Sequence, residues 1–211
     1  MAYMTTSDFE SRNDITLNST DFPTTALVQE WIDDTTSEIN GEIGRTFDKG
    51  EVTDSLPVEQ STQVFFIKSP PIDTSESFSA VYNSTYSEFE TPTWTNATIS
   101  VVDASIGAVK FNTPQAYRSG DAVKITYTGG YDTVPYTVKK LCRLIVQREY
   151  TDTQLQQEIG DATVTSIASI RVSEKSASGM KLQLERLDKK IESAWEDLKS
   201  QHYIGTFEGM Y

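Results

Sequence analysis

Apolar residues recur every three or four positions in three segments of the chain, and we predict a helix in each. The first helix begins near Thr24 or Thr25 and carries an apolar stripe of Val28, Ile32, Ile39 and Ile43. The second runs from Val134 to Tyr150 or on to Ile159. The third spans residues 177–202, and its seam is predicted to pack against the other two helices. The members of that seam are Met180, Leu184, Leu187, Ile191, Ala194 and Leu198.

The pattern changes between residues 50 and 129, where short apolar runs alternate with Ser, Thr, Pro and Gly. Such runs at this spacing are typical of a small antiparallel β-domain. The strands that we expect span residues 63–68, 78–82, 97–102, 108–111 and 122–127, with turns at 103–107 and 119–121.

These elements predict an α+β protein, a helical bundle of three main helices with an inserted small antiparallel β-sandwich or β-barrel domain. The bundle takes residues 24–49 and 130–202, and the β-domain takes 50–129. Residues 1–23 are interpreted as an N-terminal arm, with 1–20 flexible or extended, and 203–211 as a C-terminal tail. Residues 160–178 are polar and small, which favours a hairpin or an extended loop.

Charge is distributed unevenly along the 211 residues, whose net charge is −13. Residues 1–104 have a balance of −14, and residues 105–211 have a balance of +1. The acidic half disfavours general nucleic-acid binding. Two halves of different charge suit stacked or head-to-tail assembly, although simple solubility explains the same pattern.

The sequence offers little for chemistry, so we expect no enzymatic activity, no cofactor and no metal site. His202 is the single histidine, which leaves serine or cysteine nucleophiles without a base, and no glycine-rich phosphate-binding motif is present. Cys142 cannot form an internal disulfide and reads as a buried small side chain. No run of 18 apolar residues exists and the first residues do not resemble a signal peptide, so we expect no membrane association.

Two groups of side chains are candidates for binding other proteins. Basic residues crowd the second helix, where they are candidates for subunit contacts: Lys139, Lys140, Arg143 and Arg148. Apolar and aromatic residues lie in a segment too short and glycine-broken to fold alone, and we expect this tail to dock into a partner protein or a neighbouring subunit: Tyr203, Ile204, Phe207, Met210 and Tyr211.

Three short motifs, taken in order, carry a resemblance to a known family. Gly-Arg-Thr-Phe at 44–47 ends the first helix, Ser-Pro-Pro-Ile at 69–72 follows a strand, and Ile-Thr-Tyr-Thr-Gly-Gly-Tyr at 125–131 precedes Val134-Pro135. Over about residues 24–150 the chain resembles the head–tail connector (adaptor) proteins of tailed double-stranded DNA viruses. The third helix and the tail match only in kind, and the β-insertion is longer than in the shortest members.

The resemblance implies a structural adaptor in the virion neck, made in the host cytoplasm. It implies a homo-oligomeric, dodecameric ring that joins the portal to a neck, stopper or tail protein. It also makes the portal or an adjacent subunit the expected partner of the 203–211 tail. Double-stranded DNA would pass through its lumen without sequence-specific binding.

Two other classes of function stay open from the sequence. Tyr82, Tyr86, Phe89 and Trp94 in the β-domain could form a platform for a surface carbohydrate-binding or adhesion module. The many carboxylates could serve a hydrolase, although nothing singles out a pair.

Overall fold

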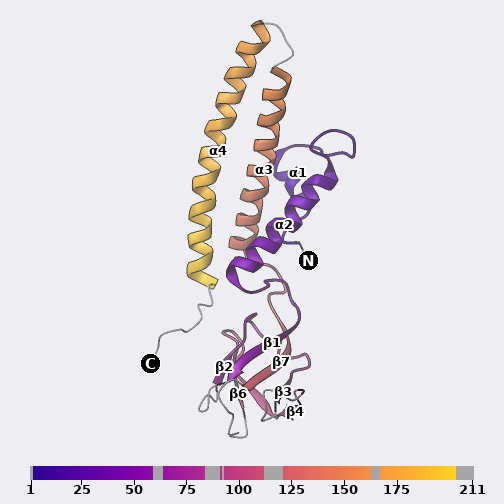
Figure 1. The fold of residues 1–211 in the computed structure, drawn as a ribbon, viewed down its shortest axis with the longest axis vertical. Coiled ribbons are helices and arrows are strands. Elements are labelled where there is room, and N and C mark those ends of the chain that lie inside the picture. Colours follow the sequence, from indigo (N-terminus) through magenta and orange to yellow (C-terminus); the bar gives the residue numbers. More distant parts are fainter. Residues whose placement is uncertain are drawn as a thin grey trace. The chain divides into compact units, whose positions relative to one another are not determined.

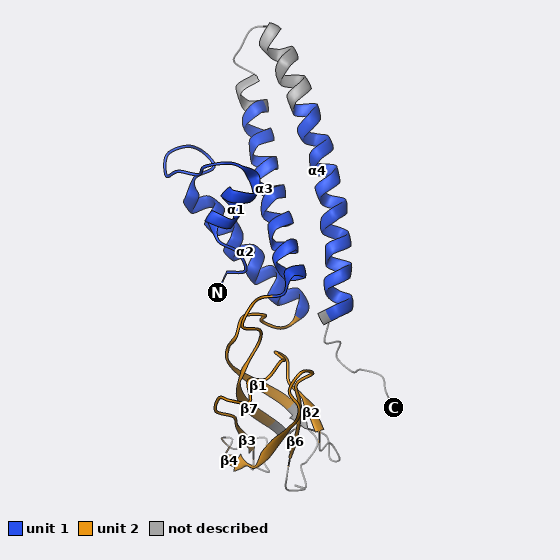
Figure 2. Cartoon of the chain, turned by 180° about the vertical axis from the view of Figure 1, so that it is seen from behind, with its two compact units in different colours: residues 1–43, 135–211 blue, residues 44–134 orange. Residues whose placement is uncertain are grey.

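The computed structural model describes residues 2–58, 64–83, 91, 93–111, 121–162 and 167–202. The chain divides into two compact units, residues 1–43 with 135–211 and residues 44–134 (Figure 2). The first unit contains the helices α1 (Thr6–Asn13), α2 (Thr25–Ile43), α3 (Tyr136–Ala162) and α4 (Ile167–His202). The described part of the second contains seven strands in two antiparallel sheets. The α+β class is therefore confirmed, with four helices in the described part rather than three main ones.

The prediction of a flexible or extended N-terminal arm is wrong over α1. Thr5 and Asp8 form a capping box, in which the Thr5 hydroxyl accepts from the Asp8 N–H at 3.1 Å and the Asp8 carboxylate accepts from the Thr5 N–H at 3.0 Å. Phe9 is fully buried and meets the ring of Tyr150 on α3 edge-on, with the ring centroids 5.5 Å apart. This aromatic contact and the cap fix a helix that is too short to be stable alone.

The predicted stripe of α2 is confirmed, because Val28, Ile32, Ile39 and Ile43 are all buried. α3 begins at Tyr136, and the Pro135 carbonyl accepts its first hydrogen bond from the Lys139 N–H at 3.1 Å. Proline suits this place because its missing N–H has no helical partner to lose.

α4 runs alongside α3 and packs mainly against it (Figure 1). Residues 167–178 belong to α4, so the expected hairpin or loop at 160–178 is wrong for most of its length. The residues there have ordinary helix propensity, and small polar residues do not stop a helix without proline or a glycine cap. The seam on α4 is buried at Leu187, Ala194 and Leu198, whereas Met180, Leu184 and Ile191 are only half-buried.

The β-unit has two antiparallel sheets. The first has strand order β1-β7-β3-β4 and comprises β1 (Gly50–Val58), β7 (Asp121–Gly129), β3 (Ser79–Asn83) and β4 (Trp94–Ala97). The second has order β2-β6-β5 and comprises β2 (Val64–Phe66), β6 (Ala108–Phe111) and β5 (Ile99–Asp103). One buried cluster takes residues from both sheets, among them Phe65, Val109, Ile125 and Tyr127. The described strands do not close into a barrel, so the β-sandwich or β-barrel prediction is confirmed only as two antiparallel sheets.

β1 and β4 are the two strands of the described part that sequence reasoning missed, and β1 is the longer. It pairs with β7 along its whole length, from Gly50 opposite Gly129 to Val58 opposite Asp121. Its alternation is broken because Asp54 is buried at a position where an apolar residue is expected. The strand lies at the edge of its sheet, where Pro57 is tolerated.

Candidate functional site

The three motifs that carry the family resemblance meet in one place within the β-unit. Residues 44–49 enter this unit from α2, residues 129–134 leave it toward α3, and the Ser69–Ile72 turn lies against both. We call this set the junction network, and its members are Arg45, Phe47, Asp54, Ser69, Pro70, Tyr127, Gly130 and Tyr131.

A buried polar chain forms the centre of the junction network. The Tyr127 hydroxyl donates to Asp54 Oδ2 at 2.8 Å and accepts from the Ser69 N–H at 2.9 Å. The same carboxylate oxygen of Asp54 accepts from the Lys68 N–H at 2.7 Å. Burial raises the pKa of Tyr127, and the adjacent Asp54 raises it further, so the hydroxyl keeps the proton that it donates. The Tyr127 hydroxyl, Asp54 Oδ2 and the Ser69 N–H thereby each have a hydrogen-bond partner in a buried position.

Arg45 ties the entry segment to the turn and to the exit segment. Its guanidinium donates to the Pro70 carbonyl and lies over two aromatic rings, 4.9 Å from the centroid of Phe47 and 5.7 Å from that of Tyr131. The side chain is buried, and the planar guanidinium can stack and donate at the same time.

Glycine is required at 129 and 130 because backbone approaches both positions closely. A Cβ on Gly129 would overlap the Ser69 carbonyl and the Tyr127 ring, and one on Gly130 would overlap the Asp48 carbonyl. Gly130 also has a φ of +97°, and its N–H donates to the carbonyls of Ser69 and Pro71, each at 3.0 Å.

Backbone hydrogen bonds and an ion pair also join the entry segment, residues 44–49, to the exit segment, residues 129–134. The Tyr131 N–H donates to the Phe47 carbonyl at 2.9 Å, and the Lys49 N–H donates to the Tyr131 carbonyl at 3.2 Å. Lys49 Nζ lies 2.6 Å from Asp73 and 2.8 Å from Asp132. Hydrogen bonds from Lys49 and Ser75 hold the pKa of Asp73 well below its ordinary value.

The predicted subunit-contact residues occupy different sides of α3. Arg148 pairs within the chain, with Glu149 at 2.9 Å and Asp188 of α4 at 3.4 Å. Lys139 is exposed and Arg143 half-exposed, and Lys140 is half-buried. Whether any of the four contacts another subunit stays a prediction.

Two other groups of predicted binding residues are only partly described. The tail residues Tyr203, Ile204, Phe207, Met210 and Tyr211 lie outside the described residues. Of the aromatic platform, Tyr86 and Phe89 also lie outside them. One face of Trp94 is covered by Lys124, whose ammonium is 4.1 Å from the ring centroid.

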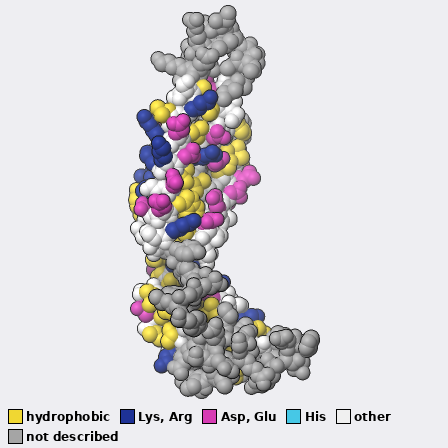
Figure 3. All heavy atoms as spheres, turned by 60° about the vertical axis from the view of Figure 1, so that its left-hand side comes forward, with side chains coloured by type: hydrophobic (Ala, Val, Ile, Leu, Met, Phe, Trp, Pro, Cys, Tyr) yellow, Lys and Arg dark blue, Asp and Glu magenta, His cyan; other side chains and the backbone are white. Residues whose placement is uncertain are grey.

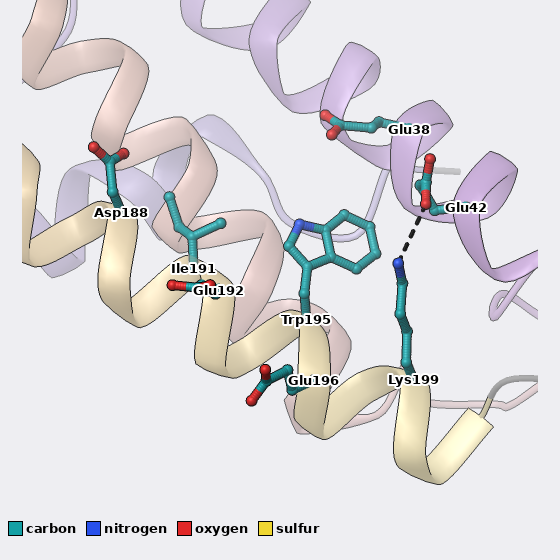
Figure 4. Close-up of a pocket in the computed structure, with 8 residues that line it drawn as sticks. All are labelled: Glu38, Glu42, Asp188, Ile191, Glu192, Trp195, Glu196 and Lys199. Carbon is teal, nitrogen blue, oxygen red and sulfur yellow. Dashed lines mark hydrogen bonds and ion pairs between the residues drawn. The ribbon is translucent and has the colours of Figure 1, made fainter.

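A groove between α2 and α4 was not predicted from the sequence. It has a volume of about 460 Å³, and Ile191 and Trp195 of α4 give it an apolar lining. Five carboxylates surround these two residues: Glu38, Glu42, Asp188, Glu192 and Glu196. Figure 4 shows Trp195 projecting from α4 toward α2, beside the ion pair between Lys199 and Glu42 at 3.4 Å. No sequence signal relates α2 to α4, because about 150 residues separate them and each carboxylate alone resembles a solvated helix position.

The described residues show little else that is chemically active. No cluster of three or more His, Cys, Asp or Glu side chains suited to a metal occurs among them. None of the helices, as far as they are described, is long and apolar enough to cross a membrane. Cys142 is buried, and burial raises the pKa of its thiol to about 12, which makes it unreactive.

Comparison with known proteins gives a structural likeness only. No protein-family model matches the chain, and no curated protein sequence matches it. Among solved structures, the chain is similar to one in the neck of an empty gene transfer agent particle computed with C6 symmetry, with a TM-score of 0.50. The match is 14% identical and covers 70% of this chain and 77% of that one. A chain in the virion of a native gene transfer agent particle is 13% identical, with coverages of 70% and 78% and a TM-score of 0.47. At this identity the first likeness shows a shared fold.

Proposed function

We propose that this protein is a structural component of the neck of a phage-like particle, where it acts as a head-to-tail adaptor. The observation that carries the proposal is its likeness, over 70% of the chain, to a chain in the neck of a gene transfer agent particle. The junction network adds support, because the motifs that resemble the adaptor family form one buried structure rather than lying scattered.

In this proposal twelve copies form a ring between the portal and a stopper or tail protein, and DNA passes through the lumen without being read. A ring of this kind needs complementary surfaces and no catalysis, since many modest contacts are summed by symmetry. The acidic balance of the chain disfavours tight DNA binding, which suits a conduit.

Deleting the gene tests the proposal. An adaptor is required for head–tail joining, so we expect DNA-filled heads that carry the portal and free tails that never attach. A carbohydrate-binding module would instead leave joined particles that fail to adsorb to cells, and that result would refute the adaptor role. Averaged images of the wild-type neck then give the copy number. We expect twelve density units at the level of this protein, and six units would show that the ring has six copies.

A further inference from the structure

The helical unit has a half-exposed apolar strip that nothing in the described chain covers. α4 packs mainly against α3, and Met180, Leu184, Ile191 and Trp195 are left half-exposed along its side. Figure 3, which brings the α4 side forward, shows hydrophobic side chains running down the helical unit between charged ones. The lower part of this strip is the groove between α2 and α4.

Charge defines what the groove can accept. Five carboxylates line it against one cation, and that cation, Lys199, already pairs with Glu42 and lies 5.5 Å from the Trp195 ring centroid. Asp188 is likewise engaged by Arg148. Glu192 and Glu196 are exposed one turn apart on α4, and like charges at this spacing repel. An occupant with cations and aliphatic stems would relieve this repulsion and cover Trp195.

A surface of the required kind exists elsewhere on the same unit. At about 100° per residue, Arg143 lies about 140° and Lys139 about 180° around α3 from Arg148, which faces α4. Arg12 of α1 is a further cation near this part of α3: the pKa of Asp8 is lowered first by its hydrogen bonds to Thr5 and then by the charges of Lys139 and Arg12. Arg12 and Lys139 are exposed and Arg143 is half-exposed, so this side of the unit presents cations to a partner.

We propose that the groove between α2 and α4 of one copy binds the Lys139–Arg143 side of α3 of a second copy. The two surfaces are different parts of one unit, so the contact is head-to-tail and repeats from copy to copy. A series of head-to-tail contacts closes into a ring when the rotation from each copy to the next adds up to a full turn. The inference rests on the proposed neck ring and names the surfaces that form it.

Complementary charge reversal tests the contact. The groove variant carries Glu192→Lys and Glu196→Lys, and the helix variant carries Lys139→Glu and Arg143→Glu. A matched control, Glu30→Lys with Asp197→Lys, changes the net charge as the groove variant does, at exposed helix positions that do not line the groove. Circular dichroism of each full-length variant checks that it is folded.

Each reversed variant alone should assemble at least about tenfold more weakly than wild type, because like charges then face each other. An equimolar mixture should recover assembly, since each groove then meets an oppositely charged helix in alternating order. Assembly is measured by sedimentation of the purified proteins at rising concentration and by counting joined particles when the variants replace the wild-type gene.

Several results would overturn the inference. Normal assembly by both variants, or failure of the mixture while the control assembles, would show that these surfaces do not pair. If gene deletion leaves head–tail joining intact, the proposed neck function is wrong. The contact between copies is then tested separately, by concentration-dependent self-association of the purified protein in solution. Two negative results together would rule the contact out. The wild-type protein would stay monomeric in solution, and carbodiimide treatment of particles would give no Lys139–Glu192 or Lys139–Glu196 cross-link between copies.

Discussion

Replacing Tyr127 with Phe removes one oxygen atom from the centre of the junction network. The ring of Tyr127 is fully buried, so its packing is kept while both hydrogen bonds of the hydroxyl are lost. Asp54 loses its donor at 2.8 Å, and the Ser69 N–H loses its acceptor at 2.9 Å. Both of these residues are also buried, so water does not replace the missing partner without local rearrangement.

The cost follows from these two losses. A hydrogen bond to a charged group contributes about 1.5–3 kcal/mol, and an N–H left buried without a partner costs about 1–3 kcal/mol. The expected destabilisation of the β-unit by Tyr127→Phe is therefore about 2.5–6 kcal/mol. Since about 1.4 kcal/mol corresponds to a factor of ten, amide exchange through opening of this unit should accelerate at least about sixtyfold.

Hydrogen exchange of the full-length protein is the suitable assay, because it resolves the β-unit from the helical unit. The Ser69 and Lys68 amides report the network directly, and those of α3 serve as an internal reference. Tyr136→Phe is the matched control. Tyr136 is 67% exposed, and its substitution should change stability by less than about 0.5 kcal/mol.

Exchange at Ser69 within about threefold of wild type in Tyr127→Phe would refute this reasoning. A double-mutant cycle with Asp54→Asn sharpens the result, because residues in one hydrogen-bond network couple by about 0.5–3 kcal/mol. Additive effects of the two substitutions would show that the hydroxyl and the carboxylate act independently.

Three further predictions concern other parts of the chain. Leu198→Ala, at a fully buried position, should cost about 2–5 kcal/mol in thermal or chemical denaturation, whereas Ile191→Ala, at a half-exposed one, should cost less than half as much. The lowered pKa of Asp73 beside Lys49 means that this pair stabilises the β-unit above about pH 4 and ceases to do so as acid protonates Asp73; Asp73→Asn should therefore flatten the fall in stability between neutral and acidic pH. Cys142 should resist a thiol-specific reagent at pH 8 until the protein unfolds, and rapid labelling of the native protein would contradict its burial.

The sequence predicted those elements whose apolar period is unbroken. The stripe of α2 and the strand β6 were found because most of their buried positions are apolar, with Thr35 and Thr36 as the buried polar residues of α2. β1 was missed because Asp54 occupies an inward position, and its reason for being there, the hydroxyl of Tyr127, lies 73 residues away. α1 was missed although Thr5-x-x-Asp8 has the spacing of a capping box, because one buried residue, Phe9, gives no periodicity.

Contacts between distant segments explain what sequence reasoning could not reach. The motif residues of the junction network were named individually, but the stacking of Arg45 on Phe47 and Tyr131 depends on how the sheet brings residues 45 and 131 together. The groove is of the same kind, since its carboxylates come from α2 and α4 and are unremarkable on either helix alone.

The junction network also has a consequence for an adaptor. The chain passes between its two units at two places, after Ile43 and before Pro135, so a load carried along the backbone of the proposed adaptor passes through both segments. Within the β-unit the two are hydrogen-bonded to each other and share the Ser69–Pro71 turn, which makes them one hydrogen-bonded structure rather than two independent linkers. Segments tied in this way must open together, and their opening exposes Arg45, Asp54 and Tyr127 at once. We therefore expect the two segments to resist opening cooperatively. This accounts for a polar network in a place where two flexible linkers would satisfy the topology alone.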